Sequence, residues 1–227
     1  EQAANGDSEV QPPLSLPPAW VESAESPQTQ SADLPVLLPA MGVLAGAPLS
    51  LKPIAISQVL EPLLASATTI AQERHLSLEA YLPDDLPLVQ ADAQALREVL
   101  NNLLENALKY TQPGGSVWVE ATLSTLAEPA EMGLEVAVSD NGPGIPQADL
   151  PRLFERRFRG VQAGGSVPGS GLGLAIAQAL MTQMHGKIQV FSPARINHLD
   201  HHRTEGGSSQ YPGTTFSVWL PLANTVQ

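Results

Sequence analysis

Four short motifs follow one another along this 227-residue chain, and their order constrains the fold more than any other feature. They are NLLENALKYT (102–111), SDNGPGIP (139–146), GSGLGL (169–174) and PGTTF (212–216). The first lies in a helical pattern of apolar residues, the second ends an apolar strand pattern, and the third opens another helical pattern. Each motif alone is a weak signal. Together they indicate that the chain has, besides a hydrophobic core, a ligand pocket to which several helices, strands and loops contribute.

The composition excludes several classes of protein. Hydrophobic residues make up 43% of the chain and aromatic residues only 4%, so the core should be mainly aliphatic. The absence of cysteine excludes disulfides and thiolate metal sites, and it fits a reducing compartment, which we expect to be the cytoplasm. A net charge of −12 argues against nucleic acid as a partner, because phosphate backbones bind clustered Lys and Arg.

Residues 1–50 differ in composition from the rest. They contain acids but no Lys or Arg, and they are rich in Pro, Ser, Ala and Gln. This composition predicts a flexible linker before a domain over residues 51–227. The uncharged stretch 34–51 could be interpreted as a membrane span, but its prolines and glycines would break so short a helix. A linker that docks some apolar residues is the favoured interpretation, and no membrane contact or signal peptide is expected.

Hydrophobic periodicity predicts alternating strands and helices. Helices are expected up to residue 73 with Ser57 as N-cap, over 93–110 with Asp92 as N-cap, and over 174–185, with a helical turn within 150–158. Strands are expected at 54–56, 76–82, 117–123, 134–139, 187–192 and 215–220, with loops at 124–133 and 193–213. This order predicts an α+β two-layer sandwich, in which helices cover one face of a mixed sheet.

The helix 93–110 has two different faces. At about 100° per residue, one face carries polar side chains, namely those of Asn102, Glu105, Asn106 and Lys109. A solvated surface is the simpler interpretation of such a face. However, Asn is a poor helix former, and two asparagines lie four residues apart in mid-helix. An amide oxygen beside a lysine suits a magnesium ion that also carries phosphate oxygens, with Lys109 contacting a phosphate.

Asp140 ends an apolar strand and precedes Asn-Gly-Pro-Gly. A plain turn is one interpretation, since Asn-Gly and Pro-Gly are turn dipeptides. The functional interpretation is that the Asp140 carboxylate accepts a hydrogen bond from the amino group of adenine. Gly142 and Gly144 would then let the flat base approach the backbone closely.

Two further segments suit a phosphate ligand. A glycine loop, residues 169–173, opens an apolar helix and would offer backbone N–H groups to phosphates, although a flexible linker has similar glycines. The segment 153–159, LFERRFR, lies between glycine-rich stretches. Its phenylalanines favour a mobile lid with arginines facing a triphosphate, over an ordinary surface helix.

Residues 51–222 resemble the ATP-binding catalytic domain of sensor histidine kinases, in the GHKL superfamily shared with gyrase, Hsp90 and MutL. NLLENALKYT resembles the N box of that family, SDNGPGIP the G1 box, LFERRFRG the F box, GSGLGLAIA the G2 box, and PGTTFSVWLP the last strand. The resemblance implies a Bergerat-type ATP-binding fold, with ATP and Mg²⁺ as ligands.

The resemblance also implies a role for each matching residue. Asn106 would be the magnesium ligand, supported by Asn102, while Lys109 and Arg159 would approach the phosphates. Tyr110 would lie along the nucleoside, and Thr214 would help Asp140 to recognise adenine. The remaining pocket residues would shape the loops around the nucleotide: Gly142, Gly144, Gly169, Gly171, Leu172 and Gly173.

One position favours phosphoryl transfer over hydrolysis. In the hydrolysing branch of the superfamily, the residue four before the magnesium asparagine is usually a water-activating Glu, but here it is Asn102, a poor base. No histidine of the chain fits the phospho-acceptor motif of the family. The expected partners are therefore a histidine-bearing dimerisation domain, in the same parent protein or in trans, and a response regulator. A GHKL-type ATPase and a non-catalytic nucleotide-binding module remain the alternatives.

A metal site in the loop 193–213 is a weaker hypothesis. His198, Asp200, His201 and His202 could bind zinc, but no further ligand is evident. A polar insertion is the favoured interpretation of this loop.

Overall fold

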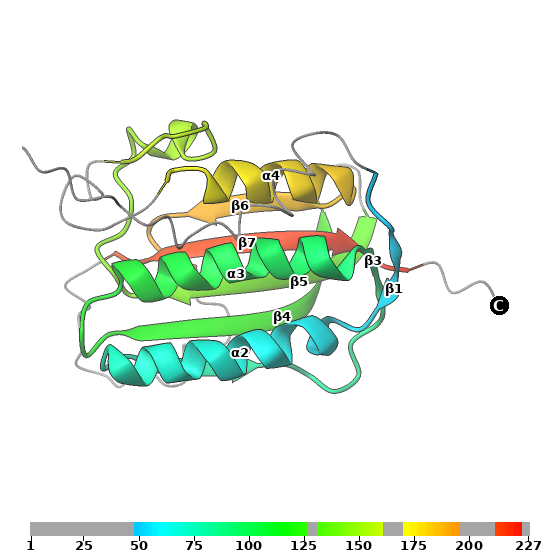
Figure 1. Cartoon of the computed structure of the whole chain (residues 1–227), viewed down its shortest axis with the longest axis horizontal. Helices are drawn as coiled ribbons and strands as arrows, with labels where there is room; N and C mark the ends of the chain where they lie inside the picture. The colour runs from blue at the N-terminus through cyan, green and yellow to red at the C-terminus, as the bar shows by residue number, and fades with distance from the viewer. Residues whose placement is uncertain (1–47, 127–130, 161–169, 196–211, 224–227) are drawn as a thin grey trace, which may run out of the picture. The chain divides into compact units, whose positions relative to one another are not determined.

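A five-stranded mixed sheet forms one layer of the fold (Figure 1). The computed structural model describes residues 48–126, 131–160, 170–195 and 212–223. Across the sheet the strand order is β2 (Ser77–Tyr81), β4 (Ser116–Leu126), β5 (Glu131–Asp140), β7 (Thr214–Pro221) and β6 (Lys187–Phe191). β2 pairs in parallel with β4, and the other neighbours are antiparallel. The central strands β5 and β7 are therefore protected from solvent at both edges.

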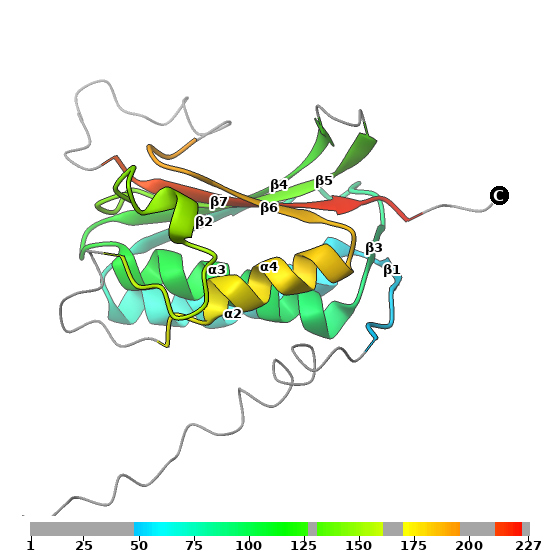
Figure 2. The same cartoon turned by 90° about the horizontal axis from the view of Figure 1, so that it is seen from above.

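Within the described residues three α-helices form the second layer, and all lie on one face of the sheet (Figure 2). They are α2 (Ile56–Glu73), α3 (Ala93–Tyr110) and α4 (Gly173–Gln183). α3 lies between the other two and contacts both. The buried core is almost wholly aliphatic and fills the space between the helices and the inward side chains of β4, β5 and β7. The predicted two-layer α+β sandwich is confirmed. No helix within the described ranges is long and apolar enough to cross a membrane.

The start of the domain differs from the prediction. The strand expected at 54–56 lies earlier, as β1 (Lys52–Ile54), and it pairs antiparallel with β3 (Val89–Ala91), which was not predicted. Ser57 is not the N-cap of α2, because the helix already begins at Ile56 and its N-cap residue is Ala55. Ile56 is only 2% exposed, so its burial in the core fixes where the helix begins, without a side-chain cap.

The β4–β5 hairpin is longer than predicted. Its pairing continues to Leu126 and Glu131, so the loop expected at 124–133 is wrong except for residues 127–130, which lie outside the described residues. Trp219 explains the extension, because its indole Nε1 donates a hydrogen bond to the backbone oxygen of Ser124 (3.3 Å). A Cβ on Gly133 would lie 2.2 Å from the same indole, so only glycine allows this packing.

The helical turn predicted within 150–158 is present, but it is short. A short 3₁₀ helix, η1 (Leu150–Arg152), is present, and the remainder of 150–158 consists of turns and bends. The loop 193–213 is described only at its ends, so the histidines proposed as zinc ligands lie outside the described residues, as does Gly169.

Asp92 begins α3 as predicted. Its Oδ1 accepts hydrogen bonds from the backbone N–H groups of Gln94 and Ala95 (both 3.0 Å), which would otherwise lack partners inside the helix. Its second oxygen, Oδ2, accepts from the backbone N–H of Ser50 (3.0 Å). Asp92 therefore joins the entry of the domain to the helix that carries most of the polar motif residues.

Replacing Asp92 with Ala should lower the free energy of unfolding by about 1 kcal/mol, the usual contribution of an N-cap side chain. Asp92→Asn should recover most of this loss, because an amide oxygen can accept the same bonds. Urea unfolding measures both effects, with Asp84→Ala in the exposed turn before β3 as the control. Equal stability of the Asp92→Ala and Asp84→Ala variants would contradict the assigned role of Asp92.

Candidate functional site

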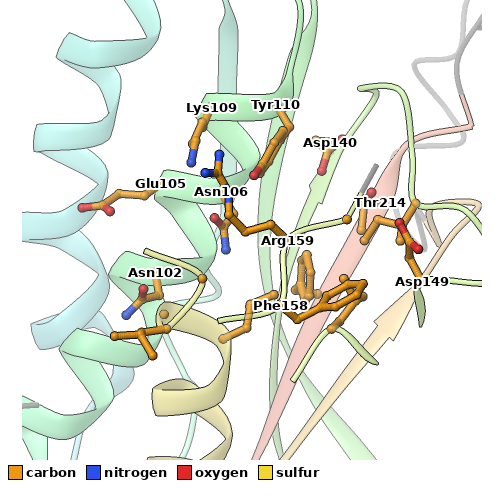
Figure 3. A pocket seen from close by; sticks show the side chains of 18 of the residues that line it. Asn102, Glu105, Asn106, Lys109, Tyr110, Asp140, Asp149, Phe158, Arg159 and Thr214 are labelled. Atoms are coloured by element: carbon orange, nitrogen blue, oxygen red, sulfur yellow. The ribbon is translucent and has the colours of Figure 1, made fainter. Parts of the chain in front are cut away.

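A cavity of about 420 Å³ lies between α3, the end of β5, the segment 143–160 and the start of α4 (Figure 3). Most of the residues predicted from the sequence line it, namely Asn102, Asn106, Lys109, Tyr110, Asp140, Gly144, Arg159, Gly171, Leu172, Gly173 and Thr214. Gly142 does not line the cavity. The volume suits a ligand of nucleotide size.

The α3 helix supplies one wall of the cavity. Its apolar face is buried in the core, while its polar side chains line the cavity at helical spacing. Glu105 also lines the cavity and accepts a hydrogen bond from Asn101 Nδ2 (2.6 Å). Glu98, one turn before Asn102, lines the cavity too and was not predicted. Its helical spacing from Asn102 could have revealed it.

Two cations make part of the cavity attractive to an anion. Lys109 and Arg159 both line it. Burial, and secondarily the positive charge of Arg159, lower the pKa of Lys109, while Glu105 acts in the opposite direction. Lys109 Nζ also lies 5.1 Å from the centre of the Tyr110 ring. An anionic group between Lys109 and Arg159 would relieve their mutual repulsion, so this region suits a phosphate.

Asp140 lies at the other end of the cavity, as the last residue of β5, and is only 5% exposed. Its Oδ1 accepts a hydrogen bond from the backbone N–H of Gly142 (2.8 Å), and the backbone of Thr214 supplies a second. Burial nevertheless raises the pKa of Asp140 to about 6. A buried carboxylate with capacity for another donor suits an amino group of a ligand.

Gly142 supports Asp140 without lining the cavity. A Cβ at this position would lie 2.8 Å from Asp140 Oδ1 and 3.1 Å from the backbone oxygen of Tyr110, so a side chain would displace the carboxylate. Gly144, whose φ is +74°, turns the chain against Pro212, where a Cβ would lie 2.5 Å from Pro212 Cγ. The SDNGPGIP motif therefore fixes the carboxylate and holds its loop close to the start of β7.

The described part of the glycine loop, residues 170–173, contacts both the segment 153–159 and α3. The backbone N–H of Arg157 donates to the oxygen of Gly171 (2.8 Å), where φ is +67°. A Cβ on Gly171 would lie 2.9 Å from the Arg157 backbone, and one on Gly173 would lie 2.1 Å from Asn102 Oδ1. These two glycines let the loop approach both neighbours.

The segment 153–159 contributes unequally to the cavity. Leu153, Phe158 and Arg159 line it, whereas Arg156 and Arg157 do not. Arg152 lies over the Phe158 ring at 4.6 Å and forms an ion pair with Glu155 (3.2 Å). Only one of the three arginines expected to face the ligand therefore does so in this structure.

Apolar residues were missed in the prediction because each resembles an ordinary core residue. Ile145, Ile176 and Phe216 line the cavity. Such residues suit the faces of a flat ring. Their only signal in the sequence was position, since Ile145 belongs to the SDNGPGIP motif and Phe216 to PGTTF.

The side chain of Asn106 fits a divalent cation. Asn106 lines the cavity, and no described residue forms a hydrogen bond with its amide, so the amide oxygen is available as a ligand. The described ranges contain no cluster of three or more His, Asp or Glu that could bind a metal by itself. A hard cation here would take one amide oxygen from the protein and its other ligands from phosphate oxygens and water.

Comparison with known proteins agrees with this geometry. Residues 91–224 match the family described as histidine kinase-, DNA gyrase B- and HSP90-like ATPase. The sensor histidine kinase Hik2 of Synechocystis sp. is 41% identical over 165 residues, which are 73% of this chain and 36% of Hik2. The adaptive-response sensory kinase SasA of Prochlorococcus marinus is 39% identical over 120 residues, covering 53% of this chain and 31% of SasA. The chain thus spans about a third of the length of these relatives.

Solved structures show the same likeness. The mycobacterial sensor histidine kinase MprB is 29% identical and superposes with a TM-score of 0.56, over 75% of this chain and 98% of that one. Full-length ShkA, solved with AMPPNP, is 26% identical with a TM-score of 0.59, over 82% of this chain and 36% of that one. The chain therefore belongs to the histidine kinase-, DNA gyrase B- and HSP90-like ATPase family, as an ATP-binding domain of the sensor histidine kinase type.

Proposed function

We propose that this domain binds Mg-ATP and donates the γ-phosphoryl group to a histidine on a dimerisation domain, from which a response regulator receives it. Such a reaction would take place in the cytoplasm, where ATP and response regulators are found. The proposal rests on the distribution of charge within one cavity, in which a carboxylate and two cations lie in different places. The buried carboxylate of Asp140, which could accept a hydrogen bond from adenine, lies at one end of the cavity, and Lys109, Arg159 and residues 170–173 also line it, where we place the phosphates.

In this proposal the residues of the chain bind, orient and neutralise charge. Asp140 holds the adenine amino group, with Thr214 beside it, and the apolar residues of the cavity contact the ring. Lys109 and Arg159 counter the negative charge of the phosphates, which the overall charge of −12 would otherwise repel. Asn106 would hold Mg²⁺, which supplies further charge neutralisation between the phosphate oxygens when bound.

The transfer itself needs little covalent chemistry from this domain. An imidazole nitrogen of the acceptor bonds to the γ-phosphorus, while the bond to the β–γ bridging oxygen breaks and its electron pair leaves on ADP. The proton of the imidazole passes to a base of the acceptor domain or to solvent. The role of this domain is to present the γ-phosphoryl group in line with an incoming histidine.

A second candidate function is hydrolysis of ATP without a protein acceptor. One observation supports it, because Glu105 lines the cavity as an exposed carboxylate near Asn106. Against it, the position four residues before Asn106 is an amide, and Glu105 already accepts a hydrogen bond from Asn101. Phosphoryl transfer is therefore the better-supported function.

The transfer reaction can be tested with labelled ATP and the dimerisation domain of a related sensor kinase. The wild-type chain should label the acceptor histidine, and Asn106→Asp should reduce the rate by at least about tenfold, since it places a negative charge beside the phosphates. Gln94→Glu is the matched control, an amide-to-acid change on an exposed position of the same helix, and it should transfer normally.

Other outcomes of this experiment would contradict the proposal. Binding of ATP without any transfer would favour a nucleotide-binding module. Steady release of phosphate without the acceptor, abolished by Glu105→Gln, would favour the ATPase.

If Asp140 recognises adenine, the preference of the chain for ATP over GTP should depend on pH. The ionised carboxylate should prefer the amino group of adenine to the carbonyl of guanine, so the chain should prefer Mg-ATP to Mg-GTP at about pH 8. Because the pKa of Asp140 is about 6, the preference should shrink as the pH falls through this value. Calorimetric titration at several pH values measures it, and the ratio of the two affinities cancels the titration of the shared triphosphate.

Asp140→Asn is the internal control for this titration. The variant should show a weak preference with no step near pH 6, because no carboxyl remains to titrate. A constant preference for ATP in the wild-type chain across this range would contradict the assigned role of Asp140.

A further inference from the structure

Glu98 and Asn102 form a connected pair at the end of the cavity that lies farthest along α3 from Asp140. Asn102 Nδ2 donates to the backbone oxygen of Glu98 (2.9 Å) and to its carboxylate Oε1 (3.2 Å). Both residues line the cavity. The Glu98 carboxylate therefore adds a side-chain bond to a backbone bond, and together they fix the nitrogen of the Asn102 amide.

The oxygen of the same amide faces the start of α4. Gly173 is the first residue of that helix, and a Cβ there would lie 2.1 Å from Asn102 Oδ1. Any side chain at residue 173 would push α3 and α4 apart at this point. The amide of Asn102 thus has a fixed direction, with its nitrogen towards Glu98 and its oxygen against the first turn of α4.

We propose that Glu98 is a positioning residue: by holding Asn102 it sets where the α4 N-terminus and residues 170–173 stand in the phosphate end of the cavity. This inference rests on the proposed function, since it concerns how that site holds a triphosphate. Asn102 lies away from Asp140 and Thr214 in Figure 3, and Gly173 lies against Asn102. In the proposed site the terminal phosphate is therefore the part of ATP that would reach residues 170–173. A loop displaced by a small distance should therefore weaken ATP more than ADP.

The environment of Glu98 agrees with a positioning role. The side chain is half-buried, and desolvation raises its pKa, while the hydrogen bond from Asn102 opposes this shift and Glu105 reinforces it. A carboxylate beside a phosphate subsite is unfavourable for an anionic ligand unless the carboxylate has another task. Here that other task is to accept a hydrogen bond from the Asn102 amide. For this bond Glu98 needs an oxygen acceptor more than a negative charge.

The test compares Glu98→Ala with Glu98→Gln in the full chain, using calorimetric titration with Mg²⁺ and either a non-hydrolysable ATP analogue or ADP. Glu98→Ala should weaken the ATP analogue by about tenfold and ADP by less than about threefold, in line with the loss of one hydrogen bond to a charged group. Glu98→Gln keeps an oxygen acceptor and should bind both ligands within about threefold of the wild type. Glu61→Ala, an exposed position on α2, is the matched control.

A second variant tests the other side of the contact. Gly173→Ala places a methyl group against Asn102 Oδ1 and should reproduce the selective loss of the ATP analogue, with circular dichroism confirming a folded chain. Equal weakening of ATP and ADP by Glu98→Ala, or a Gln variant as weak as the Ala variant, would overturn the positioning role. If the wild-type chain binds neither nucleotide, the proposed function itself fails. That outcome differs from the two results above, in which the wild-type chain binds and only the effects of the Glu98 variants contradict the positioning role.

Discussion

The fold and the site both depend on α3 having two faces. Its aliphatic face is buried against the sheet and against its neighbours α2 and α4, so the helix lies at the centre of the sandwich. Its polar face forms one wall of the cavity. Because one rigid helix carries both faces, the packing of the core places the side chains that would meet the metal and the phosphates. The N-cap Asp92 then ties this helix to the entry of the domain.

The adenine end of the cavity carries a cost in stability. The pKa of Asp140 is about 6 in the folded chain, compared with an ordinary value of 3.8, so the folded state holds this proton more tightly than the unfolded state. Its contribution to stability is therefore complete below pH 3.8 and is lost as the pH rises through about 6, a difference of about 3 kcal/mol. At neutral pH the ionised Asp140 therefore lowers the free energy of unfolding, and a bound amino group would partly offset this loss.

Much of the fold was predictable because its signals are local. Asp92, the helical period of α3 and the apolar strands β5 and β7 each follow from a few neighbouring residues, and the mixed sheet with helices on one face follows from their order. The prediction failed where distant residues decide. β3 forms because β1 pairs with it, and the β4–β5 hairpin extends because Trp219 packs against Gly133 and Ser124.

In the candidate site, too, residues with a local sequence signal were predicted and residues without one were missed. Polar and glycine residues in the motifs, such as Asn106 and Asp140, were identifiable because their types are unusual for a helix interior or a strand end. Glu98 was missed because a glutamate on a helix is ordinary in sequence, and its spacing of four residues from Asn102 gains meaning only from the bond between the two side chains. The apolar lining was missed because Ile176 has no feature that separates a ligand contact from a core contact.

The site as proposed holds a purine against Asp140 and a metal-bound triphosphate against α3 and the glycine loop, all in one cavity. A crystal structure of the chain with Mg²⁺ and a non-hydrolysable ATP analogue tests it most directly. We expect the amino group of the base to lie within hydrogen-bond distance of the Asp140 carboxylate, and the metal to bind the amide oxygen of Asn106. A nucleotide bound elsewhere, or a base directed away from Asp140, would contradict it.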